Sequence, residues 1–386
     1  MKALFNYIQG DKVIWVIVLL LSIVSLLVVY SSVETLAYRS HSGNAGYFLI
    51  KHFIIILFGF LLIYMVHNVR YTVFSRISQV ALYISVPLLL FTLLKGVNEG
   101  NANRWLQIPG TGLTFQTSDF AKLALLIYVA RMLALKQNIL TDFKTGFLPI
   151  IIPVIVICGL IFPSNFSTAF LLFVNCLCIM FIGKAKMTHI LLTIGVGIAF
   201  AGLFMFIVFK FPHINNRVAT WKSRIESFTK GDKADNYQAD QAMIAIATGG
   251  PVGKGPGNST QKNFLPQASS DFIFSILVEE YGTIMALAMV FLYLTFLFRG
   301  VRIATRSTKT FGSLIAIGLS LNLVMQALIN MCVAVHLIPV TGQPLPLVSM
   351  GGTSIWFTSI AVGIILSVSK ETENTTTSNS NIVATT

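Results

Sequence analysis

Long apolar runs separated by short polar segments extend from about residue 13 to residue 369. A helix that crosses the ~30 Å hydrocarbon layer of a membrane needs about 20 mostly apolar residues. Runs of this kind predict ten transmembrane helices, at 13–31, 48–66, 77–95, 119–136, 148–163, 165–183, 188–210, 272–298, 311–336 and 350–369. The first run is longer than the core of a signal peptide, so we interpret it as a span. The pattern predicts an all-α polytopic membrane protein.

The composition agrees with this interpretation. Of the 386 residues, 55% are hydrophobic and 11% are charged, whereas an average globular domain is about 25% charged. This balance excludes soluble dehydrogenases, zinc proteins and helix-turn-helix regulators. All four cysteines lie inside apolar runs, where thiols behave as small hydrophobic side chains rather than as disulfides or zinc ligands.

The formal net charge of +13 could indicate nucleic acid binding, but the positions of the charges indicate topology instead. Positive residues concentrate in cytoplasmic loops. With the N-terminus inside, fourteen basic residues lie in short cytoplasmic segments: Lys2, Lys12, Arg70, Arg76, Arg131, Lys136, Lys144, Lys184, Lys186, Arg299, Arg302, Arg306, Lys309 and Lys370. The opposite short loops hold five: Arg39, Lys51, Lys95, Arg104 and Lys122. We therefore expect no nucleic acid partner and both termini in the cytoplasm.

Residues 1–370 are predicted to form a single membrane domain. Within it, residues 211–270 form a large extracytoplasmic loop between the seventh and eighth spans, and loops of this length are usually functional. Residues 371–386 are polar and poor in aromatics, which predicts a disordered cytoplasmic tail.

Acidic residues at helix ends are candidates for chemistry, because ionisable groups at membrane depth are costly. Asp271 opens the eighth predicted helix, where it is either an N-terminal cap, together with Ser269 and Ser270, or a catalytic base. Glu279 and Glu280 follow in the same helix, and polar contacts inside the bundle are the simpler interpretation of that pair. Asp119 lies three residues before Lys122, a spacing that favours a local ion pair.

Two loops add further candidates. Residues 249–262, GGPVGKGPGNSTQK, fail as an ATP-binding loop because Gly255 stands where a serine or threonine is required. This stretch is either a flexible connector or a turn whose amides, with Lys254 and Lys262, bind a lipid-linked pyrophosphate. Trp105, beside Arg104, is either an interfacial anchor or a surface that stacks on a sugar. Residues 338–352 are too rich in Pro and Gly for a helix, so we expect them to be buried or to line a cavity.

Four blocks of the sequence resemble the SEDS family (shape, elongation, division and sporulation), whose members include FtsW, RodA and SpoVE. They are NRWLQI, FQTSDFAKLA, NYQADQAMIAIATGGPVGKGPGNSTQKNFLPQASSDFIFSILVEEYG and PVTGQPLPLVSMGGTS. The resemblance covers roughly residues 11–370, and the start, GDKVIWVIVLLLSIVSLLVVYSS, is most similar to the FtsW branch.

The resemblance implies an inverting peptidoglycan glycosyltransferase in the bacterial inner membrane. Its substrate would be lipid II, its leaving group undecaprenyl pyrophosphate, and its partners a class B penicillin-binding transpeptidase and other division proteins. The family's essential carboxylate falls on Asp271, and its functional Arg-Trp pair falls on Arg104 and Trp105. A divalent cation, Mg or Mn, is a possible cofactor with Asp271 as a ligand, and no nucleotide is required.

The residues themselves fit this chemistry. A carboxylate can accept the proton of an attacking sugar hydroxyl, and cations stabilise a departing pyrophosphate. The candidate cations are Arg104, Lys122, Arg217, Arg224, Lys254 and Lys262. The chain departs from the family pattern twice: Asp119 in QTSD stands where a glutamate is usual, and Asn165 in PSNFST stands near an acidic position. Alternatives that remain open are a lipid II flippase and a non-catalytic division scaffold.

Overall fold

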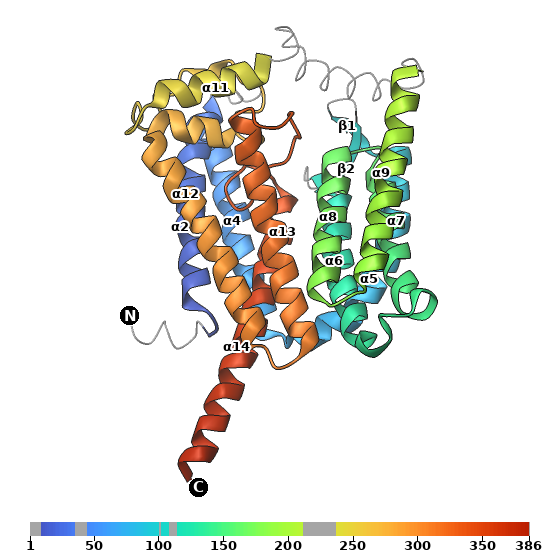
Figure 1. The fold of residues 1–386 in the computed structure, drawn as a ribbon. Coiled ribbons are helices and arrows are strands. Elements are labelled where there is room, and N and C mark those ends of the chain that lie inside the picture. The colour runs from blue at the N-terminus through green and yellow to red at the C-terminus, as the bar shows by residue number, and fades with distance from the viewer. Residues whose placement is uncertain (1–8, 35–44, 100–101, 108–113, 211–236, 386) are drawn as a thin grey trace.

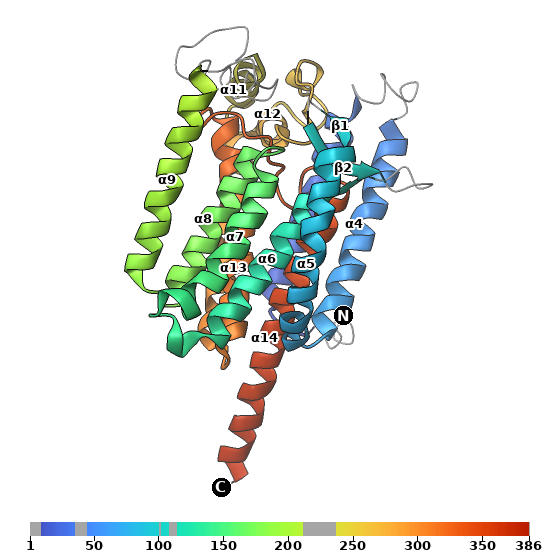
Figure 2. The same cartoon turned by 90° about the vertical axis from the view of Figure 1, so that its right-hand side faces the viewer.

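The computed structural model describes residues 9–34, 45–99, 102–107, 114–210 and 237–385. These residues form a bundle of long, roughly aligned helices (Figures 1 and 2). The helices that match the predicted spans are α2 (Lys12–Ser32), α4 (Ala45–Asn68), α5 (Tyr71–Lys95), α6 (Thr117–Leu135), α7 (Leu148–Ile161), α8 (Phe166–Ile182), α9 (Met187–Lys210), α12 (Ile273–Arg306), α13 (Thr310–Ala334) and α14 (Thr353–Thr385). The predicted mostly helical membrane fold is thus confirmed.

Among the described residues, seven helices are long and apolar enough to cross a membrane, and α8 and α9 contain shorter apolar stretches. The helix α6 falls in neither group, because Asp119, Lys122 and Arg131 interrupt its apolar sequence. The number of ten spans therefore stays a prediction. A short connector separates α7 from α8, as the sequence suggested.

The apolar side chains sort into a buried core and an outward-facing surface. Ile150, Leu172 and Ile365 are fully buried. On α4, by contrast, Ile54 and Leu57 are more than half exposed. Extended apolar surface of this kind is unfavourable in water but is the expected lining of a bilayer.

The start of α2 and the middle of α14 lie at the same end of the bundle. Asp11 caps α2 by accepting a hydrogen bond from the Val13 amide at 2.9 Å, and it also forms an ion pair with Arg299 near the end of α12. Gly10 packs beside the backbone of Leu366 in α14. The opposite end carries α11 (Tyr237–Gly249) and the strands (Figure 1). Two chain ends on one side agree with an even number of crossings.

A small antiparallel sheet, which the sequence analysis did not predict, lies between α5 and α6. Its strands are β1 (Val97–Glu99), β2 (Ala102–Gln107) and β3 (Thr114–Gln116), in the order β1-β2-β3. Trp105 pairs with Val97 on one side and Gln116 on the other. Strands this short are stabilised by pairing with their neighbours rather than by their own sequence.

The prediction of one continuous helix over residues 272–298 is wrong. The backbone of α12 breaks at Gly282, whose φ of 78° and ψ of 179° are not helical. In Figure 1 the first part of α12 lies across the top of the bundle under α11, and the second part descends through it. Glu279 and Glu280 therefore lie at this end of the bundle and not deep within it.

The segment after Lys370 also differs from the prediction of disorder. The helix α14 continues to Thr385, and Figure 1 shows its last turns projecting from the bundle. No Pro or Gly follows Gly363, so nothing in the sequence obliges the helix to end at the bundle.

Candidate functional site

Asp271 lies in a tight run of turns immediately before α12. The helix begins at Ile273, and its N-terminal cap is Phe272, which makes no side-chain capping bond. Asp271 therefore directly precedes the residue that caps this helix. The turns from residue 266 onward satisfy their amides through backbone bonds such as that from Phe272 to Gln267, at 3.2 Å.

Residues 335–352, which we call the proline-rich segment, pass beside Asp271. They are irregular, as predicted, and residues 343–349 are mostly buried: Leu345 is 1% exposed and Val348 is 0% exposed. Side chains from several helices satisfy their backbone carbonyls. Tyr293 of α12 donates to Pro346 at 2.6 Å, and Ser25 of α2 donates to Val348 at 2.7 Å. An irregular backbone is tolerated within an apolar bundle because of such bonds.

The proline-rich segment is also tied directly to the turns that carry Asp271. Ser349 donates its hydroxyl to the carbonyl of Ser270 at 2.6 Å, and the amide of Met350 donates to the carbonyl of Ser269 at 2.9 Å. Asn330 of α13 donates to the carbonyl of Asp271 itself at 2.7 Å. The backbone on both sides of Asp271 is thus held against this segment.

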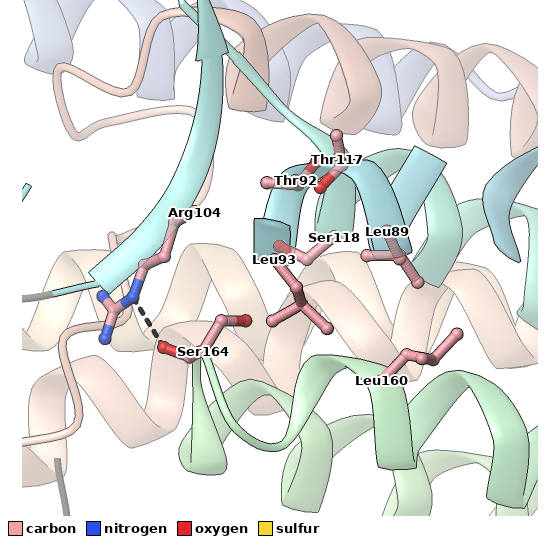
Figure 3. A pocket seen from close by; sticks show the side chains of 8 residues that line it. All are labelled: Leu89, Thr92, Leu93, Arg104, Thr117, Ser118, Leu160 and Ser164. Atoms are coloured by element: carbon pink, nitrogen blue, oxygen red, sulfur yellow. Dashed lines mark hydrogen bonds between the residues drawn. The ribbon is translucent and has the colours of Figure 1, made fainter. Parts of the chain in front are cut away.

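Arg104 reaches the same region from β2. Its Nε donates to the carbonyl of Ser164, in the connector between α7 and α8, at 2.9 Å (Figure 3). The side chain also lines a small cavity between α5, α6 and α7, whose other walls are hydroxyl side chains such as Thr117 and apolar side chains such as Leu160. Arg104 therefore joins the sheet to the mouth of a pocket with mixed polarity.

Arg104 and Asp271 converge at Gly342, in the proline-rich segment. A Cβ atom built on Gly342 would lie 3.4 Å from Asp271 Oδ2 and 3.9 Å from Arg104 Nη1. Gly342 also has a φ of 66°, a conformation that favours glycine. We call the side chains of Arg104 and Asp271 with the backbone of Gly342 the Gly342 site. The structure thus brings together a carboxylate and a guanidinium that are 167 positions apart in the chain.

Trp105 does not share this position. Successive side chains of a strand point to opposite faces, so Trp105 faces away from Arg104, and it is partly exposed. Arg217 and Arg224 lie outside the described residues.

Asp119 and Lys122 form the predicted ion pair in the first turns of α6, with 2.7 Å between Asp119 Oδ1 and Lys122 Nζ. Both are largely buried. The second carboxylate oxygen, Asp119 Oδ2, is buried without a hydrogen-bond partner among the described residues. The pair lines a small cavity between α6, α13 and α14, which Gln326 and Ser354 also line. This cavity has a polar wall that an apolar bundle does not need for packing alone.

Lys254 is engaged elsewhere, in the glycine-rich segment 249–262. It forms an ion pair with Glu279 at 2.6 Å. Glu279 is fully buried and also accepts hydrogen bonds from the Thr260 hydroxyl at 2.8 Å and the Gln261 amide at 3.2 Å. The simpler interpretation of Glu279 as a structural contact fits these bonds.

The backbone of the glycine-rich segment completes the break in α12. The amides of Lys254 and Gly255 donate to the carbonyls of Glu279 and Glu280, each at 2.9 Å. In the other direction, the amide of Thr283 donates to the Gly250 carbonyl, also at 2.9 Å. These groups would otherwise have no helical partner. The segment is therefore an integral part of the fold and not a free connector, and two of its amides are unavailable to a phosphate.

Lys262 is buried and forms an ion pair with Glu34, while also donating to the carbonyl of Gly257 at 2.9 Å. Glu280, 1% exposed, accepts a hydrogen bond from Ser31 of α2. These contacts join the top of α2 to the glycine-rich segment.

The residues near Asp271 do not form a metal site by themselves. Among the described residues, no three His, Cys, Asp or Glu side chains come together in a way that could hold a metal ion. The nearby Arg104 adds positive charge, which disfavours a second cation.

Comparisons with known proteins agree with this architecture. A family model described as a cell cycle protein, covering FtsW, RodA and SpoVE, matches residues 11–374. Stage V sporulation protein E of Bacillus subtilis (strain 168) is 30% identical over 373 residues, which cover 93% of this chain and 97% of that protein. The chain belongs to the FtsW/RodA/SpoVE family.

Other relatives carry an activity in their names. The probable peptidoglycan glycosyltransferase FtsW of Nitrosococcus halophilus (strain Nc4) is 32% identical over 340 residues, covering 86% of this chain and 85% of that protein. Among solved structures, a chain of a peptidoglycan synthase complex superimposes with a TM-score of 0.74 at 21% identity, covering 94% of this chain and 98% of that one. Thermus thermophilus RodA superimposes with a TM-score of 0.66 at 20% identity, covering 95% and 98%. These superpositions establish the fold.

The departure from the family pattern at Asn165 has a structural explanation. Asn165 is the N-terminal cap of α8, and its side-chain oxygen accepts a hydrogen bond from the Thr168 amide at 3.2 Å. It is buried beside the connector that Arg104 contacts. A neutral amide satisfies this position, so no charge is required of it in this chain.

The sequence analysis missed three contributors to the Gly342 site: Gly342 itself, the Ser164 carbonyl and Asn330. Gly342 lies within a block that resembles the family, but nothing local marks it among the other glycines. A backbone carbonyl gives no sequence signal at all. Asn330 had one usable signal, an amide in the middle of an apolar run, where a polar side chain must find a partner.

Proposed function

We propose that this member of the FtsW/RodA/SpoVE family is a peptidoglycan glycosyltransferase. It polymerises lipid II into glycan strands at the extracytoplasmic face of the bacterial inner membrane, in cell division. Relatives named probable peptidoglycan glycosyltransferase FtsW support the family activity. The observation that carries the proposal is the convergence of Asp271 and Arg104 on Gly342.

Asp271 acts as the general base of the transfer. The carboxylate takes the proton of the acceptor sugar's hydroxyl as that oxygen bonds to the anomeric carbon of the donor. The bond from that carbon to the pyrophosphate oxygen breaks on the opposite side, so the configuration inverts. The electron pair leaves with undecaprenyl pyrophosphate, and Asp271 later returns its proton to water.

Arg104 stabilises the leaving pyrophosphate. A guanidinium presents several donors in a planar fork that matches phosphate oxygens. The structure favours Arg104 over Lys254 and Lys262 by position, because Arg104 meets Asp271 at Gly342, whereas the two lysines lie against Glu279 and Glu34. A divalent cation would find one carboxylate here, Asp271, and would take its other ligands from substrate phosphates and water.

The cavity beside Asp119 and Lys122 is proposed to bind a second part of the substrate. Its polar wall lies on the same helix, α6, whose first residues line the Arg104 cavity. An ion pair at this position can hydrogen-bond sugar or peptide groups while it stays neutral as a unit.

A class B penicillin-binding transpeptidase is the proposed partner. The superposition on a chain of a peptidoglycan synthase complex supports this pairing. Such a partner would cross-link the strands on the side where they are made. We expect both termini to be cytoplasmic and the partner to contact α12, α13 and the loop before them.

A reconstitution assay tests the proposal. The purified full chain, in liposomes with its transpeptidase partner, is given fluorescent lipid II, and the products are separated by size. A glycosyltransferase produces glycan strands that a muramidase digests. Movement of lipid II between leaflets without strand formation would establish a flippase instead. If the chain neither forms strands nor moves lipid II, the scaffold interpretation is left.

A further inference from the structure

A single side chain joins the backbone at Asp271 to the backbone beside Gly342. The carboxamide Nδ2 of Asn330, on α13, donates to the carbonyl of Asp271 at 2.7 Å and to the carbonyl of Gln343 at 2.8 Å. One NH₂ group therefore bridges two chain segments that meet at the Gly342 site. Asn330 is 1% exposed, so water does not compete for these bonds.

The position of this bridge determines what the bond controls. Gln343 directly follows Gly342, and the Asp271 carboxylate lies 3.4 Å from the place of a Gly342 Cβ. Fixing the two carbonyls to one nitrogen fixes the separation of their segments. Arg104 approaches Gly342 from β2, a third segment. The direction of the Asp271 carboxylate relative to Arg104 follows from the separation of the first two segments.

Two neighbouring side chains bond to the proline-rich segment at other positions. Gln326, one helical turn before Asn330 on α13, donates to the carbonyl of Pro344 at 3.0 Å. Tyr293 donates to the carbonyl of Pro346. The bond from Asn330, by contrast, ends on the backbone of Asp271 itself.

We propose that Asn330 is a positioning residue for glycosyl transfer: its amide holds the Asp271 backbone at a fixed distance from the proline-rich segment and so aims the carboxylate at the acceptor hydroxyl. This inference rests on the proposed function, since it assigns Asn330 a role in that reaction. Positioning is worth a large factor in rate, because a displacement of about 1 Å can cost about 10²-fold.

The test compares Asn330→Leu with Tyr293→Phe in the full chain, reconstituted with the transpeptidase partner. Asn330→Leu removes both donated bonds at similar volume and adds no charge. Tyr293→Phe removes one buried bond to the same segment, away from Asp271, and is the matched control. The amount of lipid II that each variant binds, measured under conditions without turnover, gives the number of sites that can bind substrate. The value of kcat is then expressed per such site.

We expect kcat of Asn330→Leu to fall about 10²-fold per site, with KM for lipid II changed less than about threefold. Tyr293→Phe keeps kcat within about threefold. In an Asp271→Asn background, Asn330→Leu lowers the residual rate by less than about threefold, because a residue that acts through Asp271 has nothing left to position.

Three results would overturn the inference: wild-type kcat per site in Asn330→Leu, equal losses in Asn330→Leu and Tyr293→Phe, or a full further loss in the Asp271→Asn background. If Asn330→Leu does not insert, Asn330→Ser, which keeps one smaller donor, is judged by the same criteria. A wild-type chain that makes no glycan would overturn the proposed function as well. An active wild type with an active Asn330→Leu overturns the positioning role alone.

Discussion

At the scale of single residues, the structure separates carboxylates that stabilise the fold from the carboxylate that meets Arg104 at Gly342. Glu279 is surrounded by Lys254 and the donors of the glycine-rich segment, and Asp11 is fixed between the α2 amides and Arg299. Burial makes such pairs obligatory, because a lone buried charge is costly. Asp271 instead lies against Gly342, with its Oδ2 3.4 Å from the position that a Cβ on this residue would take.

The sequence identified Asp271 and Arg104 through the family resemblance but could not place them together. Each residue carries a local signal, a carboxylate at a helix start and a cation beside a tryptophan. Their meeting depends on the path of the proline-rich segment between them, and buried hydrogen bonds such as those from Asn330 to Asp271 and Gln343 hold that path. Tertiary contacts of this kind leave no periodic pattern in the sequence.

The Asp119–Lys122 pair gives a prediction at this scale. Asp119→Ala leaves the buried Lys122 without its partner and should destabilise the protein by about 3–5 kcal/mol, with loss of activity. Asp119→Glu keeps the charge and should retain most activity. Thermal unfolding and lipid II polymerisation, measured on both variants, check this. Normal stability and activity in Asp119→Ala would reduce the pair to a dispensable contact.

At the scale of elements, the apolar runs predicted the helices well because a span is defined by its own sequence. The sheet and the break in α12 were missed because both depend on bonds between segments distant in the chain. The carbonyls released at Gly282 find their donors in Lys254 and Gly255. The length and hydrophobic periodicity of residues 272–298 alone cannot show that amides of another segment will bond to the carbonyls at a break in the helix.

Close contact at this break predicts different costs for two glycine substitutions. Gly253 and Gly257 both have positive φ, of 87° and 79°. A Cβ on Gly253 would collide with the backbone of Glu280, whereas a Cβ on Gly257 would meet nothing within 4 Å. Gly257→Ala should cost about 1–2 kcal/mol, from its backbone conformation alone.

Gly253→Ala should cost clearly more than Gly257→Ala, because it also forces the glycine-rich segment away from α12. Thermal unfolding of the two variants in the same detergent measures the difference. Equal stabilities would show that the contact between Gly253 and Glu280 does not support the fold.

At the scale of the whole molecule, charge and chain ends give the same topology. The fourteen-to-five distribution of basic residues predicts cytoplasmic termini. In the structure, Asp11 and Arg299 meet at the end where Gly10 packs against α14, while the Gly342 site lies towards the sheet and α11. With the predicted orientation, the proposed chemistry would fall on the extracytoplasmic side.

Reporter fusions test this orientation. A fusion at Lys230 and a fusion after Lys370 should give opposite signals with a reporter that is active on one side of the membrane, the first outside and the second inside. A fusion at Lys309, in the connector between α12 and α13, is the matched control and should agree with Lys370. Equal signals at Lys230 and Lys370 would contradict the ten-span topology.

The central claim is that Asp271 is the general base of glycosyl transfer, and Asp271→Asn tests it most directly. Asparagine has nearly the same size but cannot accept the hydroxyl proton, and removal of a general base typically costs about 10²–10⁴ in rate. The account predicts that this variant inserts in the membrane, binds its transpeptidase partner and binds lipid II, but forms glycan strands at most at about one hundredth of the wild-type rate. Polymerisation of lipid II by Asp271→Asn at near the wild-type rate would contradict it.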